Sequence, residues 1–159
     1  MRRIVLALAA LLCVLLTGCD MAAEPEESAA PVTAEKTNTE ETDMKLWINN
    51  KEVPVTWAQN DSVTALRELA GGDGLTVSMS MYGGFEQVGS LGKSLPRDDR
   101  QTTTAAGDIV LYSGNQIVVF YGSNSWAYTR LGRITDKTPQ EMAELLGNGD
   151  TTVTIGKGL

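Results

Sequence analysis

The aromatic residues of this chain lie only in its C-terminal part, and this restricts a hydrophobic core to the same part. The three tryptophans, four tyrosines and two phenylalanines all follow residue 44. The segment from Asp20 to Met44 contains eight acids and one base, a net charge of −7. Such a segment cannot bury enough apolar surface to offset the entropy lost on ordering it. We therefore expect an acidic disordered linker over residues 19–44 and one compact domain over residues 45–159.

Alternation of apolar and polar residues predicts that the domain consists mainly of β-strands. The pattern is clearest over residues 75–81, where Leu, Val and Met alternate with Thr and Ser. The runs 109–112 and 116–121 are apolar at consecutive positions, so we expect them at the centre of a sheet, joined by a hairpin loop at 113–115. The glycine-rich segment 82–99 is expected to be irregular. Further strands are expected over residues 45–49, 53–57, 126–134 and 151–155.

Two short helices are expected, one near each end of the domain. Asp61 or Ser62 can cap the first helix, which ends at Ala70 before two glycines. The second begins with a capping box over residues 138–141 and ends at Leu146. Strands with a short helix near each end predict a closed or nearly closed antiparallel barrel.

Four segments of the domain resemble the bacterial cyclophilin-like fold proteins. They are MYGGFE (81–86), KSLP (93–96), AGDIVLY (106–112) and SWAYTRLGRI (125–134). The resemblance implies a mainly β fold, a closed antiparallel β-barrel with two short helices that close its ends. It implies no settled activity. True cyclophilins are prolyl isomerases, but their active-site motifs are not recognisable here, and their catalytic arginine has no assignable counterpart.

The N-terminus resembles the signal peptide of a bacterial lipoprotein. Two arginines precede an almost wholly apolar run from Ile4 to Leu16, and Leu16-Thr17-Gly18-Cys19 matches the lipobox. This run is shorter than the roughly 18–20 residues that a membrane-spanning helix needs. The resemblance implies a signal peptide over residues 1–18 and lipidation of Cys19. The domain is then anchored to the cell membrane on its extracytoplasmic side. An ordinary cleaved signal peptide with a chance cysteine is the alternative.

The residue types that are missing exclude several kinds of chemistry. The chain has no histidine, and its two cysteines are Cys13, in the predicted signal peptide, and Cys19. His-based triads and His/Cys zinc sites are therefore excluded, and we expect neither a metal site nor a cofactor. From Lys45 onward ten bases and twelve acids give a net charge of −2. A nucleic-acid partner would need a basic surface, so we expect none.

The first candidate ligand-binding site is the segment 82–87, which contains Gly83 and Gly84. Two adjacent glycines let a backbone approach a ligand closely, and Tyr82 and Phe85 flank them with aromatic surface. The long segment that follows favours a function here, because long loops often carry binding sites. The alternative is a bend between strands, with both aromatic side chains in the core.

The second candidate site is the segment 125–133, most of which belongs to the expected strand over residues 126–134. Side chains alternate between the faces of a strand, so Trp126, Tyr128 and Arg130 are expected on one face. Arg133 is expected on the opposite face, with Thr129 and Leu131. Aromatic surface beside a fixed cation can bind a carboxylate or a peptide carbonyl. The alternative places the aromatics in the core and pairs the arginines with surface acids.

Three functions agree with these features. The first is a membrane-anchored module that binds a peptide or a small molecule beside the two candidate segments. The second is a peptidyl-prolyl isomerase, in which Arg130 or Arg133 would donate to the proline nitrogen and weaken the amide resonance. The third is an assembly lipoprotein whose barrel docks on another envelope protein. We expect the membrane to be one partner of the chain through the lipid anchor.

Overall fold

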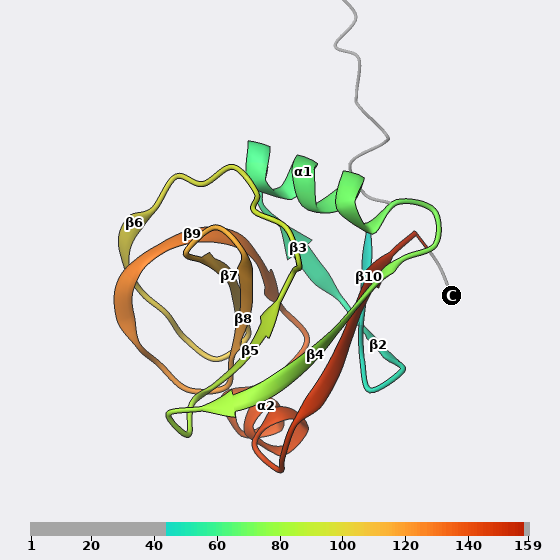
Figure 1. The fold of residues 1–159 in the computed structure, drawn as a ribbon. Coiled ribbons are helices and arrows are strands. Elements are labelled where there is room, and N and C mark those ends of the chain that lie inside the picture. The colour runs from blue at the N-terminus through green and yellow to red at the C-terminus, as the bar shows by residue number, and fades with distance from the viewer. Residues whose placement is uncertain (1–43, 158–159) are drawn as a thin grey trace, which may run out of the picture. The chain divides into compact units, whose positions relative to one another are not determined.

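The computed structural model describes residues 44–157, which form a ten-stranded antiparallel sheet and two helices (Figure 1). The mainly β class and the two short helices are thereby confirmed. The predicted signal peptide over residues 1–18, the lipidation site Cys19 and the predicted linker up to residue 43 lie outside the described residues. Met44, expected at the end of the linker, is buried, and its carbonyl oxygen accepts a hydrogen bond from the Trp57 indole at 2.6 Å.

The described elements follow one another in this order. The strands are β1 (Lys45–Ile48), β2 (Lys51–Val53), β3 (Val55–Trp57), β4 (Leu75–Tyr82), β5 (Glu86–Ser90), β6 (Arg100–Thr103), β7 (Asp108–Tyr112), β8 (Gln116–Phe120), β9 (Ser125–Ile134) and β10 (Thr151–Gly156). The helices are α1 (Asp61–Ala70), between β3 and β4, and α2 (Pro139–Leu146), between β9 and β10. Within the described part of the chain neither helix has the length and apolarity needed to cross a membrane.

The sheet curls into a nearly closed barrel because its two edge strands are consecutive in the chain. The order along the sheet is β2-β1-β10-β4-β5-β8-β7-β9-β3, and β6 pairs with β9 outside this path. Only Pro54 separates β2 from β3. Proline has no N–H to donate to a neighbouring strand. It therefore fits the corner between β2, which pairs with β1, and β3, which pairs with β9.

The main hydrophobic core fills the barrel, and the two helices cover it from opposite sides in the view of Figure 1. Helix α1 buries Val63 and Leu66 in this core. Helix α2 buries Met142 and Leu146, which are 0% and 1% exposed. Both helices are too short to be stable alone, so they depend on this contact with the barrel.

The predicted capping box of α2 is confirmed, whereas the cap of α1 differs from the prediction. Thr138 and Glu141 exchange the two hydrogen bonds of the box. Helix α1 is capped by Asn60, whose Oδ1 accepts from the N–H of Val63 at 2.9 Å. Its Nδ2 also donates to the carbonyl of Arg130 at 2.8 Å. An amide both caps the helix and links it to β9, which a carboxylate at Asp61 cannot do because it has no N–H.

Two strands are missing from the sequence-based prediction. Strand β5 lies inside the segment 82–99, which was wrongly expected to be irregular. It begins with Glu86 and Gln87 and contains Gly89, so it lacks an apolar pattern. Pairing with β4 and β8 on its two sides holds it, and a Cβ at Gly89 would clash with the Met79 side chain. Strand β6 has no apolar residue, and its ladder with β9 places it in the sheet.

A bulge in β9 changes which of its side chains share a face. One residue of β7 pairs with Arg130 and its neighbour pairs with Gly132, so Leu131 is an extra residue without a partner. An extra residue reverses the alternation of side chains beyond it. Arg133 therefore lies on the same face as Arg130, and the prediction of opposite faces is wrong.

Strands β7 and β8 are buried on both faces, as predicted. On one face their side chains join the core inside the barrel. On the other face Val110, Val118 and Phe120 form a second cluster, which Tyr128 of β9 covers. The partly buried side chains that extend this cluster are Phe85, Val88 and Tyr112. We call this side the outer face of the barrel.

Truncation of Met142 is expected to test the contact between α2 and the barrel. Met142→Ala leaves a cavity in the core and should lower the free energy of unfolding by about 2–5 kcal/mol. Glu144→Ala, at an exposed position of the same helix, should change it by less than about 0.5 kcal/mol. Urea denaturation measures both values, and equal losses in the two variants would contradict this role of α2.

Candidate functional site

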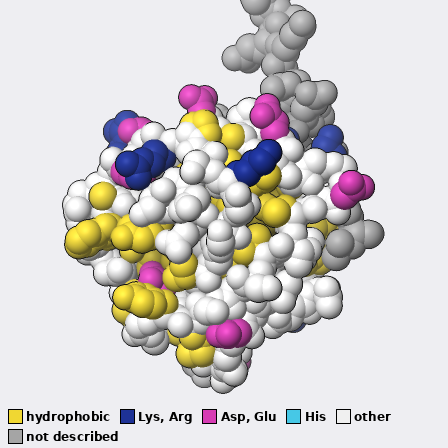
Figure 2. All heavy atoms as spheres, viewed as in Figure 1, with side chains coloured by type: hydrophobic (Ala, Val, Ile, Leu, Met, Phe, Trp, Pro, Cys, Tyr) yellow, Lys and Arg dark blue, Asp and Glu magenta, His cyan; other side chains and the backbone are white. Residues whose placement is uncertain are grey.

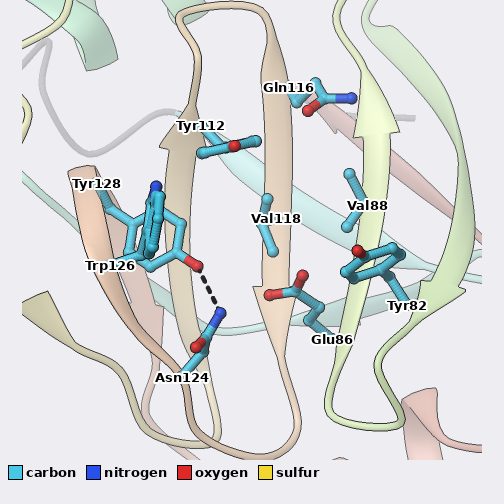
Figure 3. A pocket seen from close by; sticks show the side chains of 9 residues that line it. All are labelled: Tyr82, Glu86, Val88, Tyr112, Gln116, Val118, Asn124, Trp126 and Tyr128. Carbon is cyan, nitrogen blue, oxygen red and sulfur yellow. Dashed lines mark hydrogen bonds between the residues drawn. The ribbon is translucent and has the colours of Figure 1, made fainter.

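A pocket of about 350 Å³ opens on the outer face of the barrel. The residues that line it are Tyr82, Glu86, Val88, Tyr112, Gln116, Val118, Asn124, Trp126 and Tyr128 (Figure 3). They come from β4, β5, β7, β8 and β9 and from the turn before β9. The pocket therefore lies where five strands meet.

Two aromatic side chains at the pocket are unusually exposed. Trp126 is 57% exposed and Tyr82 is 67% exposed, although both are large and apolar. They project from opposite sides of the pocket in Figure 3. Figure 2 shows apolar side chains gathered on the side of the molecule formed by β5 and β9, around an acidic side chain. A ligand between the two rings would remove much of this apolar surface from water.

The buried wall of the pocket is held in place by Tyr128, which is 5% exposed. Its ring meets those of Tyr112 and Phe120 edge-on, with centroids 6.0 and 5.7 Å away. Its hydroxyl oxygen accepts a hydrogen bond from Nδ2 of Asn124 at 3.0 Å (Figure 3). Tyr128 is thus fixed by packing and by its polar end, as a preformed binding wall requires.

Glu86 is the acidic residue in the pocket, and it is 6% exposed. Its carboxyl group lies between the two aromatic sides of the pocket in Figure 3. Its Oε2 atom is buried and has no hydrogen-bond partner. Burial raises the pKa of this carboxyl group above 4.5. A buried carboxylate oxygen without a partner lowers stability, and such costs are typical of functional sites.

The structure brings the two predicted segments together. Tyr82 from the first segment and Trp126 and Tyr128 from the second line the same pocket. Gly83 and Gly84 form the turn between β4 and β5, with φ angles of 62° and 76° that favour glycine. They do not line the pocket, so their position agrees with the alternative of a bend between strands.

Phe85 does not line the pocket and packs against the second hydrophobic cluster. Its ring is parallel to that of Phe120, with centroids 6.5 Å apart. Its backbone oxygen also accepts hydrogen bonds from the N–H groups of Tyr121 and Gly122, both at 2.9 Å. Phe85 therefore supports the turn from which Glu86 enters β5.

One protein-family model matches a stretch of the chain that includes every residue of the pocket lining. The family model described as the cyclophilin-like family matches residues 46–156, from β1 to the end of β10. The chain belongs to the cyclophilin-like family. No curated protein and no solved structure matches the chain in the corresponding comparisons. The function of the pocket in this cyclophilin-like domain therefore has to be argued from its own residues.

The two candidate arginines of the cyclophilin-like domain lie away from the pocket lining. Nη1 of Arg130 and Nη1 of Arg133 both donate to Oδ1 of Asp108, at 2.9 and 2.8 Å. Asp108 is 2% exposed, and its Oδ2 accepts from the N–H of Ala105. The bulge at Leu131 makes this arrangement possible. The pairing agrees with the structural alternative for the arginines, with a buried acid as the partner.

Several residues of the pocket were not predicted as site residues. Glu86 lies inside the first predicted segment, residues 82–87, but was not named as a binding residue, and Asn124 lies just before the second segment. Tyr112, Gln116 and Val118 lie on strands that the sequence predicts only from their apolar pattern, and Val88 lies on β5, which the sequence does not predict. The sequence has an acid directly after Phe85, but this local feature does not predict that Glu86 is buried. Within residues 44–157 no cluster of three or more His, Cys, Asp or Glu side chains is arranged to hold a metal.

Replacement of Glu86 by glutamine is expected to stabilise the protein at neutral pH. The raised pKa means that the folded state holds the proton of Glu86 more tightly than the unfolded chain. The free energy of unfolding therefore falls as the pH rises from about 4.5 through the raised pKa. Glu86→Gln removes this decline. Urea denaturation at a series of pH values between about 4 and 8 measures it.

The matched control for this measurement is Glu68→Gln, at an exposed position of α1. It should follow the pH dependence of the unmodified protein. A Glu86→Gln variant with the same decline as the unmodified protein, or with lower stability at neutral pH, would show that the carboxylate of Glu86 is not destabilising.

The shared carboxylate predicts that Arg130 and Arg133 are coupled. Loss of one arginine leaves Asp108 a cationic partner, whereas loss of both leaves a buried carboxylate without one. The double variant Arg130→Ala/Arg133→Ala should therefore lose about 0.5–3 kcal/mol more than the sum of the single variants. Urea denaturation of the unmodified protein, the two single variants and the double variant measures the four free energies of unfolding. The excess should vanish when Asp108→Asn is present, and additivity in the original background would contradict the coupling.

Proposed function

We propose that this chain is a lipid-anchored, extracytoplasmic module that binds a peptide or a small molecule on the outer face of its cyclophilin-like barrel. The lipobox at residues 16–19 supports the anchor, with lipid on Cys19. The acidic segment that follows supports a linker that holds the domain away from the membrane, because an anionic bilayer surface repels it.

The observation that carries the binding proposal is the pocket with its exposed aromatic rim. Its volume of about 350 Å³ is in the range of ligand pockets, and aromatic walls with a few polar groups are typical of them. Trp126 and Tyr82 are exposed on either side of it, whereas the wall behind them is rigidly packed. A preformed wall with exposed aromatic rings lowers the entropy cost of binding.

The alternative, a peptidyl-prolyl isomerase, has less support from this site. Such an enzyme needs an apolar pocket and an N–H donor beside the proline nitrogen. The pocket is aromatic, and the side-chain amides of Gln116 and Asn124 belong to its wall. The arginines expected to be donors are both bound to Asp108, and neither lines the pocket.

Truncation of Trp126 tests the binding proposal. Trp126→Ala should weaken a ligand found by a fragment screen by about tenfold, because the aromatic contact and its buried area are lost. Met81→Ala removes another exposed apolar side chain, one that does not line the pocket, and should leave the affinity unchanged. Binding is measured by the NMR shift of the Trp indole N–H groups or by calorimetry. Equal affinity of both variants would place the ligand elsewhere.

A coupled proline-peptide assay on the purified chain separates the two functions. A binding module gives no acceleration of the cis–trans exchange at micromolar protein. Acceleration that is lost in Trp126→Ala but kept in Arg130→Ala would make the pocket an isomerase site that does not use the predicted arginine.

A further inference from the structure

The charge of the pocket limits the kind of ligand it can take. Glu86 supplies the one ionisable carboxyl among the described residues of its lining, and no lysine or arginine lines it. The other polar groups of the lining are amides, phenols and the indole N–H of Trp126, which carry no charge at neutral pH. An anionic ligand would therefore meet a carboxylate with no compensating cation.

The aromatic residues around Glu86 are suited to a cation. Tyr82 lies on one side of the carboxyl group, and Tyr112, Trp126 and Tyr128 lie on the other (Figure 3). The faces of Tyr and Trp rings attract cations, and Trp does so most strongly. Exposed rings on both sides of an acid are the arrangement in which such contacts add to an ion pair.

The unpartnered oxygen of Glu86 gives a second, independent reason. Oε2 is buried, and the residue is 94% removed from solvent, since 6% is exposed. No hydrogen bond joins it to Asn124, whose Nδ2 donates to the hydroxyl of Tyr128. A neutral apolar ligand would leave Oε2 without a partner, whereas an ammonium group brings opposite charge and, if it has N–H groups, donors.

A metal ion is a poorer fit than an organic cation. Hard cations need several oxygen ligands, and the described residues contain no cluster of acids around Glu86. An organic cation has its own apolar substituents, which the aromatic walls can cover. We propose that the pocket binds an organic ammonium group, with Glu86 as its counter-ion and Trp126 and Tyr82 as its aromatic walls.

This inference rests on the proposed binding function and adds the class of ligand. The ammonium group can belong to a small amine or to a lysine side chain of a peptide, since both present the same chemistry. The probes are choline with its neutral isostere 3,3-dimethyl-1-butanol, and Nα-acetyl-lysine N-methylamide with the corresponding norleucine compound. The choline pair matches in shape and differs in charge, whereas the norleucine side chain lacks both the charge and the terminal heavy atom of lysine.

The test is an NMR titration of the purified full chain in a non-ionic maltoside detergent, followed at the indole N–H of Trp126. At least one cationic probe should bind about tenfold or more tightly than its neutral isostere. Tighter binding of choline indicates a small quaternary amine as the source, and tighter binding of the lysine compound indicates a peptide. Glu86→Gln should abolish this preference, whereas Glu68→Gln should keep it.

Two results would overturn the inference. If neutral and cationic probes bind equally, the pocket does not select a cation. If Glu86→Gln keeps the preference, Glu86 is not the counter-ion. In both cases the proposed binding function stands. If no probe shifts the Trp126 signal at concentrations of about 100 mM, above the millimolar Kd range of such small ligands, the cation site is rejected. A fragment screen with Trp126→Ala then decides the binding function separately.

The stability of the Glu86→Gln variant distinguishes a ligand-binding role of Glu86 from a merely structural one. A structural glutamate would lose both stability and binding when it is changed. A ligand-binding glutamate whose charge is uncompensated should lose the preference for the cation while the melting temperature stays the same or rises. A melting temperature well below that of the unmodified protein would contradict the proposed role of Glu86.

Discussion

Two neighbouring strands that are apolar on both faces have to be covered twice, and this requirement organises the domain. These strands are β7 and β8, at the centre of the sheet. The curl of the sheet and the two helices cover one face, which becomes the barrel interior. The other face is covered by Tyr128 of the curved strand β9 and by side chains at the start of β5. The corner at Pro54 and the bulge at Leu131 are two irregularities of the strands that accompany this covering of both faces.

The cover over the outer face is incomplete, and the pocket is the part that stays open. Glu86 pairs across the ladder with Phe120 of the second cluster. At this position an apolar side chain would complete the cluster, but the residue is a glutamate. Its burial without a partner opposes folding, and the surrounding aromatic packing tolerates this because Tyr128 is held at both ends. Proteins retain groups of this kind where a ligand uses them. The buried Asp108 differs, because two arginines compensate its charge.

The sequence predicted those features that depend on local pattern. Consecutive apolar residues located β7 and β8, the loop at 113–115 has the predicted place, and Thr138 with Glu141 forms the predicted capping box. Tyr82, Trp126 and Tyr128 were predicted as site residues and line one pocket. What escaped prediction depends on partners distant in the chain. β5 and β6 exist through their ladders, and the face of Arg133 depends on one extra residue in β9. The burial of Glu86 arises only when five strands meet, so no local pattern marks it.

The most direct measurement is a titration of the Glu86 side-chain carboxyl by carbon-13 NMR, without and with saturating choline. We expect a pKa above 4.5 in the free protein, because burial disfavours the carboxylate. We expect choline to lower that pKa, because a cation that binds the carboxylate more tightly than the acid must shift the equilibrium towards it. A carboxyl that titrates at its ordinary value, and that choline leaves unchanged, would contradict both the buried charge and the cation site.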